Sequence, residues 1–133
     1  MKYIPLLLSL AASLLFQTAA RAESLVPKLM NYQGYLTDSS GLPLGNGASE
    51  NRDVTFRFWN NPTNVADENR LYSESHTVTI LDGNFSVLLG NGSPVADEAN
   101  AVASFNALFD HAVLFLGITV DDGDAGTTDA EIT

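Results

Sequence analysis

The chain contains no cysteine. This absence excludes disulfide bonds, cysteine nucleophiles, zinc–thiolate sites, iron–sulfur clusters and a lipid anchor carried on a cysteine. Many small exported domains depend on disulfides for their stability. The domain encoded here must therefore be held together by packing and hydrogen bonding alone.

Basic residues are also scarce. The chain has 6 Lys and Arg against 16 Asp and Glu, which gives a formal net charge of −10 at pH 7. Two of the bases, Lys2 and Arg21, lie at the N-terminus, so the remainder is more acidic still. Such a charge repels nucleic acid and anionic lipid head groups, so no nucleic acid partner is expected. It fits a highly soluble surface, and it equally fits a surface that binds cations.

Long apolar runs are absent except for one, from Tyr3 to Ala19. The run follows a basic start and ends before Ala20-Arg21-Ala22, which places small residues where a signal peptidase reads them. At about 17 residues, and interrupted by Pro5, it is short for a membrane anchor, which needs roughly 20. We therefore predict a signal peptide over residues 1–22, with cleavage after Ala20 as an alternative. Export by the general route would place the mature chain in the periplasm, at the cell surface or in the medium.

Cleavage would leave residues 23–133, enough for one domain with one core. Its apolar residues recur mostly with the period of two that is typical of β-strands. The clearest segment is Asp53–Trp59, in which Val54, Phe56 and Phe58 share one face. Strands are predicted there and over residues 29–36, 71–81, 84–89 and 112–120, the last apolar on both faces.

Turn chemistry separates these segments. Asp82-Gly83 predicts a tight hairpin between residues 71–81 and 84–89, because both residue types tolerate positive φ. Residues 37–47 and 60–69 are polar and contain Gly or Pro. Ser104 is placed to cap one short helix over residues 104–109.

These elements predict an all-β fold, an antiparallel β-sandwich of immunoglobulin-like or Greek-key type, over residues 23–120. Residues 121–133 are acidic and rich in glycine, which indicates a tail or linker. Five strands make a thin sandwich, so further short strands are expected near Leu42–Leu44 or before Leu71. Gly34 is expected where two segments approach closely. The predicted core consists of Met30, Tyr32, Leu36, Val54, Phe56, Phe58, Val78, Ile80, Phe85, Val87, Leu89, Leu114, Leu116, Ile118 and Val120.

Strict alternation places Glu74 and His76 on the same face as Val78 and Ile80. Charged groups do not enter a core without partners. We therefore expect either a bulge between His76 and Val78 or a marginal position for Glu74, which would be partly exposed beside a basic group.

The sequence is compatible with three kinds of binding site. Asp122, Asp124 and Asp129, with glycines for tight turning, could offer oxygen ligands to calcium. Two histidines, His76 and His111, could share a metal ion, although nothing in their spacing brings them together. Exposed aromatic side chains such as Trp59 and Tyr35 could form a platform for a glycan, or they could pack within the fold. No cofactor is predicted.

Several short strings occur in a recognisable order: NYQGYLTDSSGLPLGNG, VTFRFW, LYSESHTVTILDGNFSVLLG and LFLGITVDDGD. Over residues 30–133 this order resembles the N-terminal β-rich domain of exported bacterial surface or tail-fibre-like proteins. The resemblance implies that more chain, often a stalk of repeats, would follow Thr133, so that this sequence would be truncated. It implies no catalytic residue.

The sequence therefore predicts an exported, non-enzymatic β-sandwich module. Its expected role is that of the N-terminal structural or display domain of a larger surface or secreted assembly, with other protein domains or chains as partners. The alternative is a carbohydrate- or calcium-dependent binding module.

Overall fold

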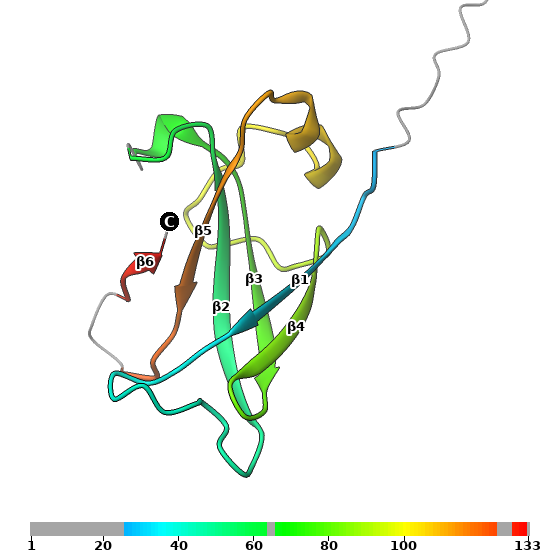
Figure 1. The fold of residues 1–133 in the computed structure, drawn as a ribbon. Helices are drawn as coiled ribbons and strands as arrows, with labels where there is room; N and C mark the ends of the chain where they lie inside the picture. Colours follow the sequence, from blue (N-terminus) through cyan, green and yellow to red (C-terminus); the bar gives the residue numbers. More distant parts are fainter. Residues whose placement is uncertain (1–25, 64–65, 125–128, 133) are drawn as a thin grey trace, which may run out of the picture.

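The computed structural model describes residues 26–63, 66–124 and 129–132, so the predicted signal peptide lies outside the described residues. The regular secondary structure of the described chain is mostly β-strand, with two short 3₁₀ helices (Figure 1). Its elements are β1 (Met30–Tyr35), β2 (Glu50–Trp59), η1 (Asp67–Asn69), β3 (Arg70–Ile80), β4 (Asn84–Leu89), η2 (Phe105–Asp110), β5 (Phe115–Val120) and β6 (Glu131–Ile132).

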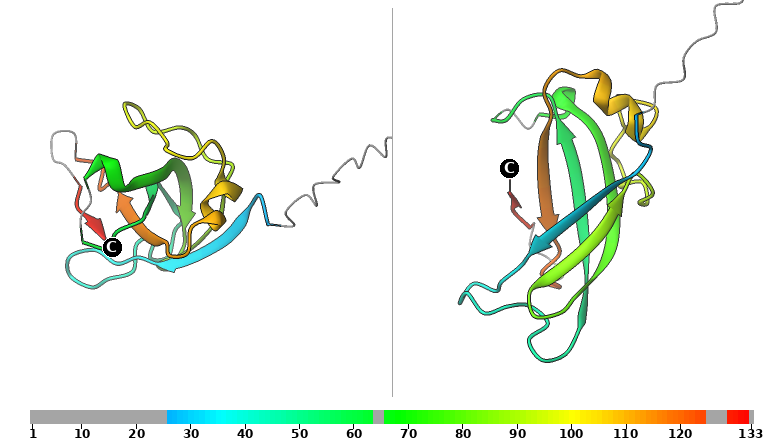
Figure 2. Two further views of the ribbon diagram at one scale, coloured as in Figure 1. Left: turned by 90° about the horizontal axis from the view of Figure 1, so that it is seen from above. Right: turned by 45° about the vertical axis from the view of Figure 1, so that its right-hand side comes forward.

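The strands form two antiparallel sheets, which confirms the all-β sandwich. One sheet has the order β3-β2-β5-β6, and the other consists of β1 and β4. The smaller sheet crosses over the larger one at an angle (Figures 1 and 2). In the larger sheet β2 is central and pairs with β3 along its whole length and with β5 from Val54 to Trp59.

The turn at Asp82-Gly83 forms as predicted, but the hairpin does not continue. Both residues have positive φ, 47° and 82°, and Leu81 and Asn84 exchange backbone hydrogen bonds of 3.1 and 2.9 Å. Beyond this pair the strands separate, because β4 pairs with β1 in the other sheet. Gly34 makes this pairing possible, since a Cβ atom there would collide with the ring of Phe85 on β4.

The core follows the predicted alternation. Val54 and Phe56 are fully buried, and every predicted core position is either buried or packed against the buried cluster. The sequence analysis missed four buried apolar residues, Trp59, Leu71, Phe105 and Leu108. The last two lie on η2, and their burial comes from where that segment docks, which no local pattern encodes.

The predicted helix is a 3₁₀ helix, Phe105–Asp110, and Ser104 does not cap it through its hydroxyl. Instead the Ser104 carbonyl accepts a hydrogen bond from the Ala107 backbone at 3.0 Å. A second 3₁₀ turn, η1, stands before β3 where a short strand was expected, and near Leu42–Leu44 only the isolated pair Thr37–Pro43 forms. Among the described residues no helix has the length and apolar character needed to cross a membrane.

Part of the expected tail belongs to the sheet. Glu131 and Ile132 form β6, which pairs with Thr119 and Ile118 of β5. No local pattern indicates this strand, because it is only two residues long and its pairing partners lie twelve or more residues earlier.

Glu74 contradicts the expectation of partial exposure. It is 1% exposed, and β2 and β3 keep an unbroken register from Ile80 to Tyr72, so no bulge removes it from the inner face. Its carboxylate is instead fully provided with donors. Oε1 accepts from the backbone of Gly90 at 2.8 Å and lies 3.1 Å from His76 Nε2, while Oε2 accepts from the backbone of Gly92 at 3.1 Å and from the Tyr72 hydroxyl at 3.3 Å.

Replacing Glu74 should therefore destabilise the fold strongly. We expect Glu74→Ala to lower the free energy of unfolding by about 3–5 kcal/mol, because two buried amide groups and a hydroxyl lose their acceptor. Glu74→Gln should fall between Ala and the native chain, since it keeps one acceptor oxygen. Urea unfolding measures the effect, with the exposed Glu68→Ala as a control expected within about 0.5 kcal/mol of the native chain. Equal stability of the two alanine variants would contradict this account.

Candidate functional site

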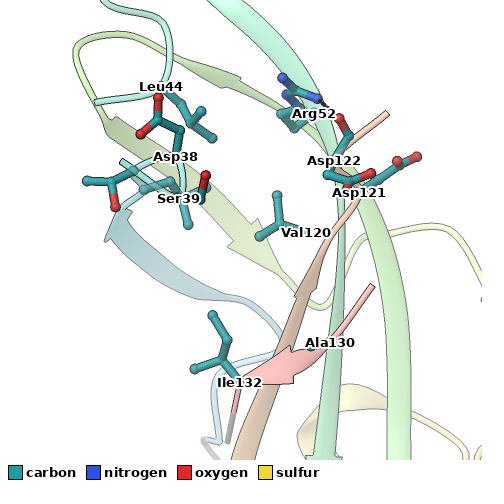
Figure 3. Close-up of a pocket in the computed structure, with 11 residues that line it drawn as sticks. Asp38, Ser39, Leu44, Arg52, Val120, Asp121, Asp122, Ala130 and Ile132 are labelled. Carbon is teal, nitrogen blue, oxygen red and sulfur yellow. Dashed lines mark hydrogen bonds between the residues drawn. The ribbon is translucent and has the colours of Figure 1, made fainter. Parts of the chain in front are cut away.

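A groove lies between the β1–β2 connection and the ends of β5 and β6 (Figure 3). Its volume is about 480 Å³, which is within the usual range for ligand pockets. Leu36 and Leu44 line it from one side, and Val120 and Ile132 line it from the other. Asp38, Ser39, Arg52, Asp121 and Asp122 supply its polar part. The groove thus combines an apolar floor with a mostly acidic rim.

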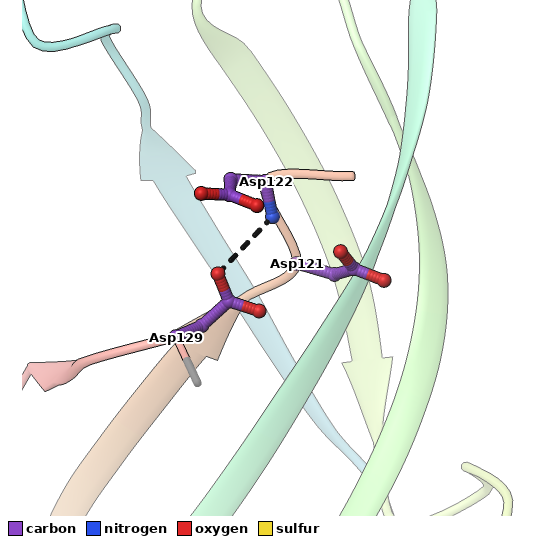
Figure 4. A group of neighbouring side chains, drawn as sticks. All are labelled: Asp121, Asp122 and Asp129. Carbon is purple, nitrogen blue, oxygen red and sulfur yellow. Dashed lines mark hydrogen bonds between the residues drawn. The ribbon is translucent and has the colours of Figure 1, made fainter. Parts of the chain in front are cut away.

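Three carboxylates lie close together, and two of them, from Asp121 and Asp122, also line this groove (Figure 4). One carboxylate oxygen from each of Asp121, Asp122 and Asp129 lies within 4.8 Å of the others. The sequence predicted Asp122, Asp124 and Asp129 as calcium ligands, so the structure brings two of these together and replaces Asp124 by Asp121. Asp121 directly follows β5, and the return of the chain into β6 brings Asp129 beside it.

Hydrogen bonds organise this acidic turn. The Asp121 and Asp122 carboxylates accept from the backbones of Gly123 and Asp124 at 2.7 and 2.8 Å. The Asp129 carboxylate accepts from the backbone of Asp122 at 3.4 Å. Arg52 donates through Nη1 to the Asp122 carbonyl at 2.6 Å, which places one cation beside the three acids. A calcium ion there would have oxygen ligands but would share the site with this guanidinium.

A second cluster of charges lies on the outer face of the larger sheet. Arg57 on β2 is its centre, with Nη2 2.8 Å and Nε 2.9 Å from Glu98 Oε1. Its Nη1 donates to the Thr119 hydroxyl at 2.8 Å and to Glu131 at 3.2 Å. Arg57 thereby joins three segments that are distant in the sequence: the connection after β4, strand β5 and strand β6.

The pKa values in this cluster follow from burial and opposite charge. Burial alone would raise the pKa of Glu98, but hydrogen bonds from Arg57 and Ser73 and the charges of Arg57 and Arg70 outweigh it and lower the pKa. Burial would lower the pKa of Arg57, and Glu98 and Glu131 together raise it instead. Both groups are therefore held in their charged forms, as in a structural ion pair.

Trp59 belongs to this cluster and is not an exposed platform. The indole is 2% exposed, donates through Nε1 to Glu131 at 2.7 Å, and lies 5.9 Å from the Arg70 guanidinium carbon. Tyr35, the other aromatic residue considered for glycan binding, is 58% exposed and lies at the end of β1 in the other sheet. The structure does not bring the two rings together.

The two histidines also have separate environments. His76 packs beside the buried Glu74. Burial of the Tyr72 hydroxyl and, second, the nearby charge of Glu74 raise the pKa of Tyr72. His111 is exposed and follows η2. Within the described part of the chain, the three aspartates are the one group with metal-binding geometry, and neither histidine belongs to it.

Removing the Glu131 carboxylate should release the edge of the sheet around Trp59. We expect Glu131→Ala to shift the emission of Trp59, the single tryptophan, to longer wavelength and to lower stability by about 1.5–3 kcal/mol. Both effects follow because the indole loses its acceptor and β6 loses its link to Arg57. Fluorescence and urea unfolding measure them, with Glu68→Ala as the control. An unchanged emission maximum would show that β6 does not cover the indole.

The comparisons with known proteins identify a family without a described activity. Residues 31–133 match a family described as a domain of unknown function (DUF8740). No curated protein and no solved structure showed a match to the chain. Because the match covers all six strands except the first residue of β1, the chain belongs to this family of domains of unknown function.

Proposed function

We propose that the chain is an exported, non-enzymatic β-sandwich module, the N-terminal structural or display domain of a larger surface or secreted assembly. In such a role the sandwich supplies a stable fold, and its loops and sheet edges make the contacts with other chains or domains. The resemblance of residues 30–133 to exported surface and tail-fibre-like proteins supports the same role.

The observation that carries this proposal is the unequal width of the two sheets. The smaller sheet has two strands and the larger has four, and among the described residues β1 pairs with β4 alone. The other edge of β1 thus presents backbone groups that have no strand partner in that part of the chain. Edges of this kind are templates for pairing with another chain segment.

The ionisable groups favour a structural role over a catalytic one. Glu74 binds the connection after β4, and Arg57 joins that connection to β5 and β6. Catalytic acids and bases need access to a substrate, whereas Glu74 is fully buried and Glu98 is closed in by two arginines. These groups hold segments of the chain together.

A calcium-dependent binding module is the second candidate, and one observation favours it. Three carboxylates from both ends of the turn between β5 and β6 approach one another at the groove. Calcium binds such oxygen ligands, and an ion there would fix the turn and the acidic end of the groove.

Export and assembly can be tested together. Expressed from Met1 in a bacterial host, the chain should reach the exported fraction with Glu23 at its N-terminus, or Arg21 if cleavage follows Ala20. Ala20→Leu should block both cleavages because it alters a position that either one requires, whereas Ala11→Leu should not. N-terminal sequencing reads the result.

In the source cells, native size analysis should find the exported chain in a larger assembly. An unprocessed internal chain, or an exported free monomer, would overturn the proposal.

The calcium candidate predicts a thermal shift. Calcium at 100 times its dissociation constant should add about 2.7 kcal/mol to the free energy of unfolding. Differential scanning calorimetry in millimolar calcium should therefore show a higher melting temperature, and Asp129→Asn should reduce the shift while Glu68→Gln preserves it. Magnesium at the same concentration separates a specific site from general screening of the acidic surface. No shift in millimolar calcium would eliminate this candidate.

A further inference from the structure

The inner face of the larger sheet is buried at its β3 edge and becomes progressively more exposed toward its β6 edge. Strand register places four residues in one row across β3, β2, β5 and β6: Glu74, Phe56, Ile118 and Ile132. Glu74 and Phe56 are 1% and 0% exposed, Ile118 is half-buried, and Ile132 is 66% exposed. Leu116 and Val120, which share the inner face of β5, are half-buried as well. The apolar surface therefore continues past the point where the second layer ends.

The narrow second sheet explains this gradient. It has two strands, and its β1 edge is the one that faces the uncovered part of β5 and β6 (Figure 2). The groove of Figure 3 joins both sides, since Leu36 follows β1 while Val120 and Ile132 belong to β5 and β6. One more strand beside β1 would lie over these residues, and its backbone would pair with the open edge.

Charge defines the chemistry of a segment that would fit there. The groove is lined by three aspartates, Asp38, Asp121 and Asp122, against one base, Arg52. Asp129 adds a further carboxylate at the same end. A second copy of this chain, with its net charge of −10, would be repelled, whereas Lys or Arg in an incoming segment would be attracted.

We propose that the side of the sandwich between β1 and β5–β6 is a docking site for an extended segment of a partner protein, added as a strand to the free edge of β1. The segment has an apolar residue at every second position, which faces Ile118, Val120 and Ile132, and it carries Lys or Arg beside the aspartates. This inference rests on the proposed function, because it specifies the contact by which the module would join an assembly.

A library of random twelve-residue peptides displayed on phage provides the probe. Selection against the folded chain, residues 23–133, should enrich peptides with alternating apolar residues and a net positive charge. Fluorescence polarisation with the synthetic peptides should show binding about tenfold or more weaker for Ile132→Lys. The matched control is Leu88→Lys, which alters an exposed apolar residue of β4 away from the groove. Hydrogen exchange should slow at backbone amides of Met30–Tyr35 when peptide is bound.

The proposal is supported if Ile132→Lys loses peptide binding, Leu88→Lys retains it, and bound peptide slows hydrogen exchange in β1. Failure to enrich peptides, enrichment of acidic peptides, or equal binding by Ile132→Lys overturns it, and so does a native dimer that Ile132→Lys converts to monomer. The export experiment remains separate: peptide binding by a chain that is not exported would sink the proposed function alone, and export into an assembly without peptide binding would sink this inference alone.

Discussion

The buried carboxylate of Glu74 is the constraint on which the arrangement of the chain depends. An ionised group inside a sheet is tolerated only when donors surround it, and two of its donors are the backbones of Gly90 and Gly92. The chain leaving β4 must therefore run along β3, where Ser75 and Ser93 exchange backbone hydrogen bonds of 2.8 and 2.9 Å. Glycine is required for this approach, since a Cβ at residue 92 would collide with the His76 ring and with the Glu74 side chain. The same path delivers Glu98 to Arg57 and Arg70, so the inner carboxylate determines where the outer ion pairs form.

Basic residues are scarce, and two of them, Arg57 and Arg70, form the ion pairs on the outer face of the larger sheet. Arg57 and Arg70 both contact segments that are distant in the sequence: Arg57 pairs with Glu98 and Glu131, and Arg70 pairs with Glu98 besides its near neighbour Asp67. The pairs with Glu98 are largely shielded from water, because the Arg70 and Glu98 side chains are 8% and 15% exposed and Trp59 lies beneath Arg70. Partly buried pairs are screened less than surface pairs. Because the chain has no disulfides, these ion pairs hold distant segments together, as a covalent bond does in many small exported domains.

The sequence allowed prediction of those features that depend on neighbouring residues. Alternation placed Val54, Phe56 and Phe58 in the core, and the two residues suited to positive φ located the turn at Asp82-Gly83. What could not be predicted depends on contacts between distant segments. The two backbone donors of Glu74 lie 16 and 18 residues further along the chain, and the acceptor of Trp59 lies 72 residues away. The candidate site divides in the same way, because turn composition indicates Asp122 and Asp129 whereas the grouping with Asp121 in place of Asp124 depends on where the return into β6 brings Asp129.

The distribution of charge differs between the outer face of the larger sheet, where the ion pairs lie, and the uncovered side between β1 and β5–β6. Arg57 and Arg70 are both used on the outer face of the larger sheet, where they neutralise Glu98, Glu131 and Asp67. Of the bases in the described residues, Arg52 alone lines the groove, and it faces three aspartates there. The uncovered side thus combines exposed apolar residues with an excess of negative charge, and a partner at the proposed docking site would have to match both. Since apolar contact supplies most of the affinity at such a surface and charge supplies orientation and selectivity, the arrangement that stabilises one side of the fold would also set the specificity of the proposed docking site on the other.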